Sequence, residues 1–370
     1  RLATPDSFLA PRARGVNVAS TTALENDRGK CRRAQPDKAP THDDEVSLPL
    51  VGPWTALDSR RGEGLLLVGG DRLVDVCRAP AGGSCTATLA AARAVGARTI
   101  ARSATAWQLP IWVASGELDA VSIVTPGEGN AALPGRSSVA AAFQGPSGRG
   151  RYAEAVYHHL LNCGLRIAPS GGSGAGDGAA RQPIGAARVY VWCGERPTLD
   201  DWLAGLANGR VVVTNGPLLR TRVSGQPPGH TFELAADEVR EFQIGLDLAF
   251  YEQYQVDYLE IVKNGEVVHE VRLDELARQA GRLPAVRFEA SGWFLVRAVT
   301  NNSQFYQFAT SGAYFVEANY QSRISRTSVE FFLTWLDEAA KHFADDSTAL
   351  ADIQAARPFW EALQPKATVE

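Results

Sequence analysis

Hydrophobic and polar positions follow one another in blocks through the middle of the chain, and these blocks predict alternating helices and strands. The spacing of apolar residues predicts a helix over 151–162, which ends at Gly164. Thr198, with acidic residues in the next turn, predicts the start of a second helix that runs over 199–208. Short apolar runs predict buried strands at 165–169, 187–192 and 210–214. This alternation with short loops is typical of an α/β layer or barrel with parallel strands.

The earlier part of the chain extends the same pattern. An alanine-rich run predicts a helix over 86–95, and the stretches 29–46 and 127–150 have the composition of loops. Further apolar runs predict strands at 15–20, 62–68, 98–101 and 120–124. Roughly seven strands therefore precede Thr214, which fits an irregular (β/α) barrel whose working residues lie at the carboxyl ends of the strands.

After residue 217 the pattern changes to period-two alternation. Asn264-Gly265 between two alternating runs is the strongest short hairpin signal in the chain. The alternating runs predict strands at 219–223, 239–248, 258–262, 267–271, 286–290, 293–299 and 313–316. This pattern is typical of an antiparallel β-sandwich.

Two amphipathic helices, over 328–343 and 346–360, complete the chain and are expected to pack on the barrel or the sandwich. The predicted domains are thus a barrel over 1–217, a β-sandwich over 218–322 and C-terminal helices over 323–370.

Composition limits the classes of function. A chain of 370 residues is long enough for two cores, and 45% apolar with 21% charged residues is usual for a globular protein. A net charge of −4 argues against nucleic acid as the main partner, because phosphate binding favours a basic face. No apolar run approaches the ~18 residues of a membrane span. The chain begins at Arg1 and contains no Met, so we expect a processed or truncated product or an incompletely recorded sequence.

The five cysteines leave two readings open. They form no Cys-x-x-Cys pair, which excludes a zinc ribbon. Cys77 and Cys85 bracket a turn-rich loop that a disulfide would close, and such a bridge would suit an exported protein, either periplasmic or extracellular. The alternative is two free thiols. Cys163, on the apolar side of a helix end, is expected to be a core thiol.

Several segments together resemble a known family. They are Leu109–Asp119, Asn162–Ile167, Gly209–Leu219, Tyr258–Gly265 and Arg323–Arg326. In this order they resemble the CehA/McbA-type branch of the PHP (polymerase and histidinol phosphatase) metallohydrolase superfamily. The resemblance implies a distorted seven-stranded barrel. It also implies two or three divalent metals, Zn, Mn or Fe, which activate water against a phosphoester or an amide-like bond.

Most of the ligands that the family uses are missing from this chain. The family pattern has an N-terminal His-x-His pair, a mid-chain Glu, lone His residues and a late Asp-x-His. Here no His-x-His occurs, 57–61 carries an Asp and two Arg in place of the Glu, and Arg102-Ser103 stands where a His is expected. His158 and His159 are neighbours on a predicted helix, so they point about 100° apart and do not chelate one ion well. The remaining histidines are expected to lie on the surface or in packing contacts.

Twelve polar or aromatic residues remain at the inferred barrel mouth. They are Glu25, Asp27, Asp58, Arg60, Arg61, Ser103, Trp107, Glu128, Ser170, Ser173, Asp177 and Asn215. Acids, arginines and a Trp suit a sugar or an anionic small molecule, or else they are solvated strand ends. Ser173 lies in a sequence close to a nucleophile elbow but lacks its last glycine and the following helix, so a plain glycine loop is the expected reading.

Three functional hypotheses follow. The first is a PHP-like barrel with a degenerate metal site, which is non-catalytic or binds a ligand, has no cofactor and is exported. The second is an active metal-dependent hydrolase whose His-x-His segment lies upstream of Arg1. The third is a structural or assembly module, such as a homo-oligomer. Its aromatic interface would be made by Phe331, Phe332, Trp335, Phe359 and Trp360.

Overall fold

The structure is a computed structural model. It describes residues 24–33, 55–62, 64–78, 82–124, 142–173, 185–194, 198–249, 252 and 254–370. The strand expected at 15–20, and the candidate residues Glu128 and Asp177, lie outside these residues.

The N-terminal half builds a seven-stranded sheet, called here the first sheet, in the order β2-β1-β3-β4-β5-β6-β7. Its strands are β1 (Leu24–Asp27), β2 (Lys30–Arg33), β3 (Thr55–Ser59), β4 (Leu65–Val68), β5 (Arg98–Ala101), β6 (Ala120–Val124) and β7 (Ala168–Gly171). β1 is parallel to β3, and β5, β6 and β7 are parallel to one another. β4 runs antiparallel to both β3 and β5, so five of the strands point the same way. Their carboxyl ends therefore share one edge of the sheet.

The predicted α/β class agrees with the structure, but a closed barrel is not shown. The structure shows a mixed α/β arrangement whose first sheet has three parallel and three antiparallel pairings, and within the described residues no pairing joins β7 back to β2. The stretch 29–46 was expected to be a loop, but Lys30–Arg33 pairs antiparallel with β1. A four-residue polar strand gives no period-two signal, and only pairing with a neighbour reveals it.

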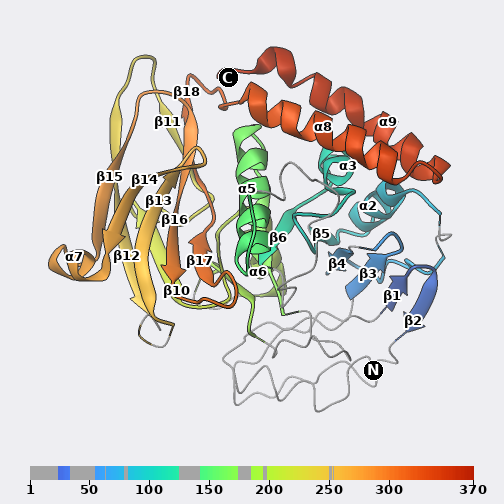
Figure 1. Ribbon diagram of the computed structural model, residues 1–370, viewed down its shortest axis with the longest axis horizontal. Coiled ribbons are helices and arrows are strands. Elements are labelled where there is room, and N and C mark those ends of the chain that lie inside the picture. The colour runs from blue at the N-terminus through green and yellow to red at the C-terminus, as the bar shows by residue number, and fades with distance from the viewer. Residues whose placement is uncertain are drawn as a thin grey trace.

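Five helices accompany the first sheet, and the two C-terminal ones pack on the other three. They are α2 (Cys85–Arg93), α3 (Leu109–Ala114), α5 (Gly148–Asn162), α8 (Arg326–His342) and α9 (Ser347–Glu361). Figure 1 shows α8 and α9 side by side, with α5 standing between the two groups of strands. No helix within the described ranges combines the length and the apolar character that a membrane crossing requires.

The aromatic stripe of α8 and α9 is core rather than surface. Phe332, Trp335 and Trp360 are fully buried, and the indole of Trp360 donates to the carbonyl of Pro110 on α3 at 3.0 Å. Phe331 and Phe359 are partly buried against the same core. These helices were expected to pack on the barrel or on the sandwich, and in the structure they contact α2, α3 and α5. The short helix α3 was not expected.

The C-terminal half forms two further sheets. The small sheet has the order β10-β12-β15, and the large sheet has eight strands, ordered β11-β18-β16-β17-β9-β8 with β13 on β16 and β14 on β13. The new strands are β8 (Arg188–Val191), β9 (Val211–Thr214), β10 (Leu218–Val223), β11 (Thr231–Leu234), β12 (Arg240–Ala249), β13 (Val256–Lys263), β14 (Glu266–Arg272), β15 (Arg282–Phe288), β16 (Gly292–Thr300), β17 (Phe308–Ser311) and β18 (Tyr314–Ala318). The expected hairpin is confirmed, with Asn264 and Gly265 both at positive φ in its turn. β11, β17 and the short helix α7 (Leu273–Arg278) were not expected.

One part of the predicted parallel layer is wrong. β8 and β9, joined by α6 (Leu199–Ala207), pair antiparallel with each other, and β9 pairs with β17 of the large sheet. The helix itself begins as expected, because Thr198 and Asp201 form a reciprocal capping box. A strand–helix–strand pattern in the sequence predicts that these elements form. It does not predict which sheet the two strands join.

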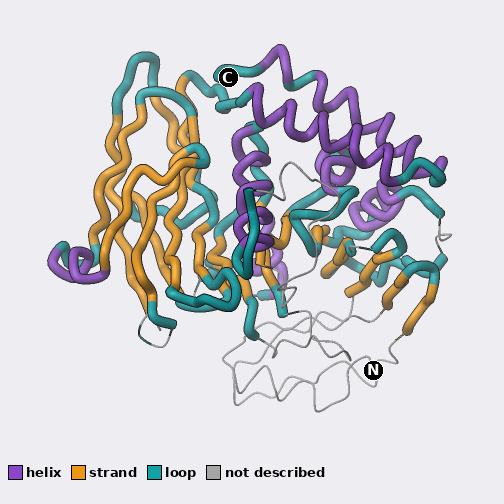
Figure 2. The backbone as a smooth tube through the Cα atoms, viewed as in Figure 1, coloured by secondary structure: helices purple, strands orange, loops and turns teal. Residues whose placement is uncertain are grey.

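β16 is buried on both faces and joins the two cores. Trp293 and Leu295 belong to the core shared with the helices, whereas Phe294 and Val296 belong to the core between the large and small sheets. Successive side chains of a strand point to opposite faces, so an almost continuous apolar sequence is what a doubly covered strand needs. Figure 2 shows the long helices on one side of the C-terminal strands, with the short helix α7 at their far edge.

Of the two readings for Cys77 and Cys85, a disulfide between them is wrong, and the alternative of two free thiols holds for Cys85 alone. Cys77 is bonded to Cys31 on β2, with a Cα–Cα distance of 5.6 Å. Cys85 begins α2 as a buried thiol that donates to Asp352 at 3.4 Å. The bridge depends on the β1–β2 hairpin, which places Cys31 beside the segment that carries Cys77. Cys163 is a buried core thiol, as expected.

The Cys31–Cys77 bridge is predicted to stabilise the fold. It spans 46 residues, and a crosslink of that length contributes about 4 kcal/mol by the loop-entropy relation. Replacing both cysteines by serine should lower the free energy of unfolding in urea by about that amount. Cys193→Ser, which removes a free thiol, is the matched control. Unchanged stability, or a Cys77–Cys85 link in peptide mapping, would contradict the assignment.

Candidate functional site

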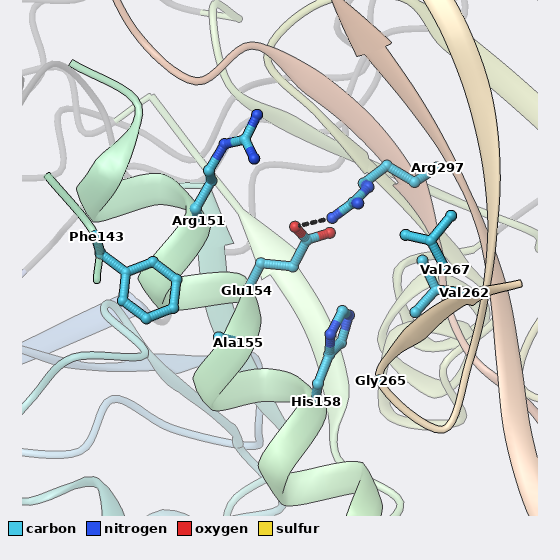
Figure 3. A pocket seen from close by; sticks show the side chains of 9 residues that line it. All are labelled: Phe143, Arg151, Glu154, Ala155, His158, Val262, Gly265, Val267 and Arg297. Atoms are coloured by element: carbon cyan, nitrogen blue, oxygen red, sulfur yellow. Dashed lines mark hydrogen bonds and ion pairs between the residues drawn. The ribbon is translucent and has the colours of Figure 1, made fainter. Parts of the chain in front are cut away.

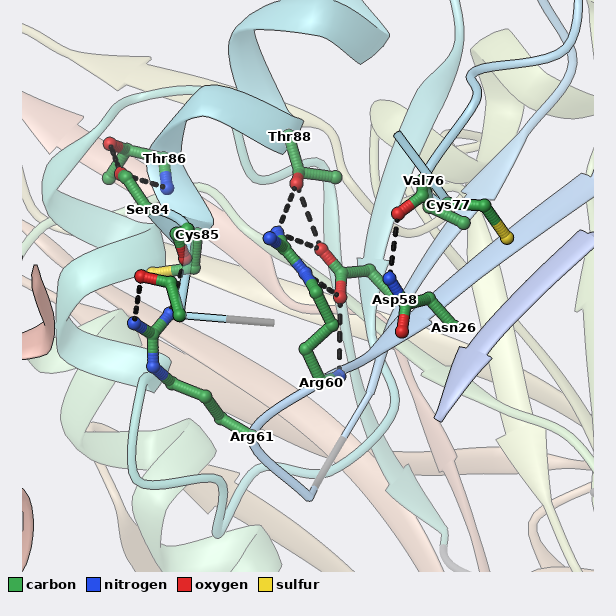
Figure 4. A network of polar contacts seen from close by, with 12 residues as sticks. Asn26, Asp58, Arg60, Arg61, Val76, Cys77, Ser84, Cys85, Thr86 and Thr88 are labelled. Carbon is green, nitrogen blue, oxygen red and sulfur yellow. Dashed lines mark hydrogen bonds and ion pairs between the residues drawn. The ribbon is translucent and has the colours of Figure 1, made fainter. Parts of the chain in front are cut away.

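A buried ion pair occupies the end of β3, where the family resemblance expects a metal ligand. Asp58 and Arg60 are each only 7% exposed. The Arg60 guanidinium meets the carboxylate with two parallel hydrogen bonds, Nε to Oδ1 at 2.8 Å and Nη2 to Oδ2 at 2.7 Å. Thr88 of α2 donates to Oδ2 at 2.8 Å (Figure 4). Both carboxylate oxygens of Asp58 are therefore engaged.

The neighbouring Arg61 is tied to the C-terminal helices. Its Nε donates to Oδ2 of Asp346 at 2.9 Å, and its Nη1 donates to the carbonyl of Gly83 at 2.7 Å. The hydrogen bond from Arg61 lowers the pKa of the Asp346 carboxyl. Since Asp346 also caps α9, this ion pair fastens the first sheet to that helix.

These contacts leave almost no space, and the group is called here the strand-end site. It is formed by Asp58, Arg60, Arg61, Leu65, Cys85, Gln108 and Trp112. The void among them measures about 10 Å³, which is about enough for one water molecule. Within the described part of the chain, the strand-end site thus has no room for a metabolite.

The other predicted residues are spread over the same edge and beyond it. Glu25 and Asp27 are half-buried on β1, and Ser103 and Ser170 are buried after β5 and on β7. Trp107 stacks on His342 of α8, with ring centroids 4.5 Å apart. None of these five residues lines the strand-end void.

Ser173 and Asn215 hold loops. The hydroxyl of Ser173 accepts from the amide of Gly185 at 2.7 Å. The side-chain amide of Asn215 donates to the carbonyl of Tyr306 at 2.9 Å, and its oxygen accepts from the amide of Phe308 at 2.8 Å. Among the residues that the structure describes, no group of three or more His, Cys, Asp or Glu side chains is arranged to hold a metal ion.

A larger cavity that sequence reasoning missed lies between α5 and the β13–β14 hairpin. This hairpin pocket has a volume of about 180 Å³. It is lined by Phe143, Arg151, Glu154, Ala155, His158, Val262, Gly265, Val267 and Arg297. Figure 3 shows Glu154 and His158 directed from α5 towards the hairpin and Arg297.

Arg297 of β16 binds two carboxylates at the pocket. It forms ion pairs with Glu154 of α5 and with Glu260 of β13. The hydroxyl of Tyr306 donates to the same oxygen of Glu154, Oε2, at 2.9 Å. Burial raises the pKa of Glu260 and of the Tyr306 hydroxyl. Arg151 also lines the pocket, so two arginines stand against the two acids Glu154 and Glu260.

Two buried polar atoms at the pocket have no partner among the described residues. They are Oε1 of Glu154, whose side chain is 3% exposed, and Nε2 of His158. Burial lowers the pKa of His158 to about 4, so the imidazole is neutral at pH 7. Glu154 and His158 are four residues apart and therefore share one face of α5. This spacing of four residues is the feature of the sequence from which the hairpin pocket could have been predicted.

The two adjacent histidines have different surroundings. His158 faces the hairpin pocket and Trp293, whereas His159 stacks on Phe331 of α8 and its Nδ1 lies 2.9 Å from the hydroxyl of Ser328. The expectation that they do not chelate one ion is in keeping with this separation.

Searches against protein-family models, curated proteins and solved structures find no match to this chain.

The buried His158 is predicted to make stability depend on pH. An unfolded-state pKa near 6.5 and a folded pKa of about 4 mean that the unfolded chain binds the proton more tightly. The contribution of this group is complete above pH 6.5 and falls as the pH drops towards 4, by about 3 kcal/mol in total.

The readout is the difference in unfolding free energy between the wild type and His158→Gln, followed from pH 7 to pH 4. This difference should shrink as the pH falls, because the variant lacks the titrating group. A constant difference over that range would refute the assignment.

Proposed function

We propose that this chain is a non-hydrolytic, ligand-binding relative of the PHP metallohydrolases. The observation that carries the proposal is the Arg60 guanidinium, which binds both oxygens of Asp58 at the end of β3. A carboxylate ligates a divalent ion through the same lone pairs. In this chain an internal cation neutralises the acid at a position where the resemblance expects a metal ligand.

The energetics of the pair support a permanent role for Arg60. Removing one partner of a buried, hydrogen-bonded ion pair costs roughly 3–5 kcal/mol, since the other charge is left buried and unpaired. A metal ion that displaced Arg60 would impose a similar penalty on the guanidinium. Thr88 adds a further hydrogen bond that fixes the carboxylate in place.

The order of the first sheet also favours the resemblance. Five strands point the same way, and the candidate residues on β1, after β3, after β5 and on β7 lie towards one edge. This is the edge that carries the reactive groups in barrels of the (β/α) type. We therefore propose a distorted (β/α)7 barrel for the N-terminal half and a β-sandwich for the C-terminal sheets.

We also propose domain limits at residues 217 and 322. The strands β8 and β9 precede residue 217 but belong to the large sheet, so the first limit is crossed by that sheet. The Cys31–Cys77 bridge supports an exported location, because disulfides persist in oxidising compartments.

Metal content and hydrolysis test the proposal together. The purified chain is incubated with Zn²⁺, Mn²⁺ or Fe²⁺, dialysed and measured by elemental analysis, and hydrolysis of p-nitrophenyl phosphate and of a p-nitrophenyl ester is followed in parallel. We expect far less than stoichiometric metal and hydrolysis no faster than in buffer. Stoichiometric retained metal would contradict the proposal, and so would metal-dependent turnover of either substrate.

A further inference from the structure

We propose that two copies of this chain form a dimer in which Tyr320 of each copy enters the hairpin pocket of the other. This contact goes beyond the proposed function and does not depend on it. It gives the pocket one occupant, and it gives a role to an exposed tyrosine that the fold itself does not need.

Tyr320 lies in a turn whose backbone suits glycine. Asn319 and Tyr320 have φ values of 53° and 57° between the paired residues Ala318 and Gln321. A positive φ is common for Asn, but a bulky residue there is strained. Three other two-residue turns between paired residues have positive φ at both positions and Gly at the second: Arg28-Gly29, Ser224-Gly225 and Asn264-Gly265. Tyr320 therefore occupies its position at a cost to the stability of the chain.

Packing within the chain returns little of that cost. The side chain of Tyr320 is 80% exposed, more than any other exposed large hydrophobic residue that the structure describes. Backbone strain of this kind is concentrated where a residue has a function, and tyrosine is one of the residues that most often anchor protein interfaces. A partner that covers the ring would supply the burial that the chain itself does not.

The charges at the hairpin pocket favour a neutral occupant. Two arginines and two acids meet beside it, so neither sign is in excess; they are Arg151, Arg297, Glu154 and Glu260. The guanidinium of Arg151 already lies over the ring of Tyr306, 5.3 Å from its centre. A second aromatic ring beside this arginine would gain the same attraction between a cation and a π-face.

The size and the remaining wall of the pocket suit a phenol ring. Apolar surface is supplied by Phe143, Ala155, Val262 and Val267. The volume of about 180 Å³ is slightly larger than an engineered cavity of about 150 Å³ that holds benzene. A tyrosine side chain therefore matches the pocket in both size and polarity.

The tyrosine and the pocket lie towards the same end of the large sheet. The hairpin turn is tied to the start of β16, because Asn264 exchanges two hydrogen bonds, of 3.0 and 2.9 Å, with the backbone of Trp293. Gly292 of β16 pairs with Val316 of β18, and the turn that carries Tyr320 follows β18. Two copies that meet at this end can exchange their tyrosines about a twofold axis, which closes the assembly at two.

Sedimentation velocity of the intact chain measures the association. We expect a monomer–dimer equilibrium with a Kd on the order of 10 μM, in which each of the two tyrosine contacts contributes about tenfold. Tyr320→Gly removes both contacts and should raise the Kd about a hundredfold, whereas the matched control Tyr320→Phe keeps the ring and should change it less than about threefold. Val267→Trp should fill the pocket and weaken association as much as Tyr320→Gly does.

The stability of Tyr320→Gly separates a binding role from a structural one. At a protein concentration where the wild type is monomeric, this variant should unfold at a temperature about 1–2 °C higher, because glycine relieves the strained turn. A residue that the fold required would lower the unfolding temperature when removed.

Mixing the two association-deficient variants tests the contact itself. Tyr320→Gly retains an open pocket without a tyrosine, and Val267→Trp retains the tyrosine beside a filled pocket. At about 100 μM each should be monomeric alone, and together they should form a heterodimer through the one contact that remains, with a Kd on the order of 100 μM. A fluorescent label on one variant identifies the heterodimer.

Three results would overturn the proposed dimer. They are a wild type that stays monomeric at about 100 μM, a Kd that Tyr320→Gly changes less than about tenfold, or a mixture of folded variants without heterodimer. Thermal unfolding verifies that each variant is folded, and Ala155→Phe fills the pocket from α5 if Val267→Trp is not. Metal content and turnover are independent of these measurements, so the non-hydrolytic assignment is decided separately.

Discussion

The fold depends on the hydrogen bonds and ion pairs that the polar side chains of α5 form inside the molecule. This helix stands between the first sheet and the large sheet, so its side chains must meet partners from both. Glu154 is held by Arg297 and Tyr306, and Asn162, at the end of the helix, accepts from the indole of Trp293 and from Arg323. The carbonyl of Asn162 also accepts from the amide of Ser325, which caps α8. One helix thus joins β16, the hairpin turn and the C-terminal helices through buried polar contacts that would be costly to leave unmade.

Arginine pairs with a buried acid at both candidate sites, in different surroundings. At β3 the pair is closed, because two guanidinium bonds and a threonine engage both oxygens of Asp58 and the void that remains holds about one water. At α5 the arginine is divided, because Arg297 binds two carboxylates, and Oε1 of Glu154 is buried with no partner among the described residues. The ion pair at β3 is thus enclosed by its partners, whereas the ion pair at α5 lies beside the hairpin pocket at the junction of the two cores.

Features that depend on neighbouring residues could be predicted from the sequence. Features that depend on pairing between distant segments could not. The capping box of Thr198 and Asp201 and the Asn264-Gly265 turn involve neighbours in the sequence, so both could be predicted from composition and spacing. The sheet that β9 joins and the partner of Cys77 depend on contacts across tens to about a hundred residues, which no local pattern encodes. The Asp58–Arg60 pair lies two residues apart, but its significance appears only when burial is known. Glu154 and Arg297 lie 143 residues apart, so the hairpin pocket could be suspected only from the i, i+4 spacing of Glu154 and His158.

The most direct test of this account is a double-mutant cycle between Glu154 and Arg297, read as free energies of unfolding in urea. The single changes Glu154→Leu and Arg297→Leu each leave a buried charge without its main partner, at a cost of roughly 3–5 kcal/mol. The account predicts that the double variant is more stable than the sum of the two losses implies, with a coupling energy of about 2 kcal/mol or more. Additive losses would show that the two residues act independently, and would contradict a fold held together across α5 by this ion pair.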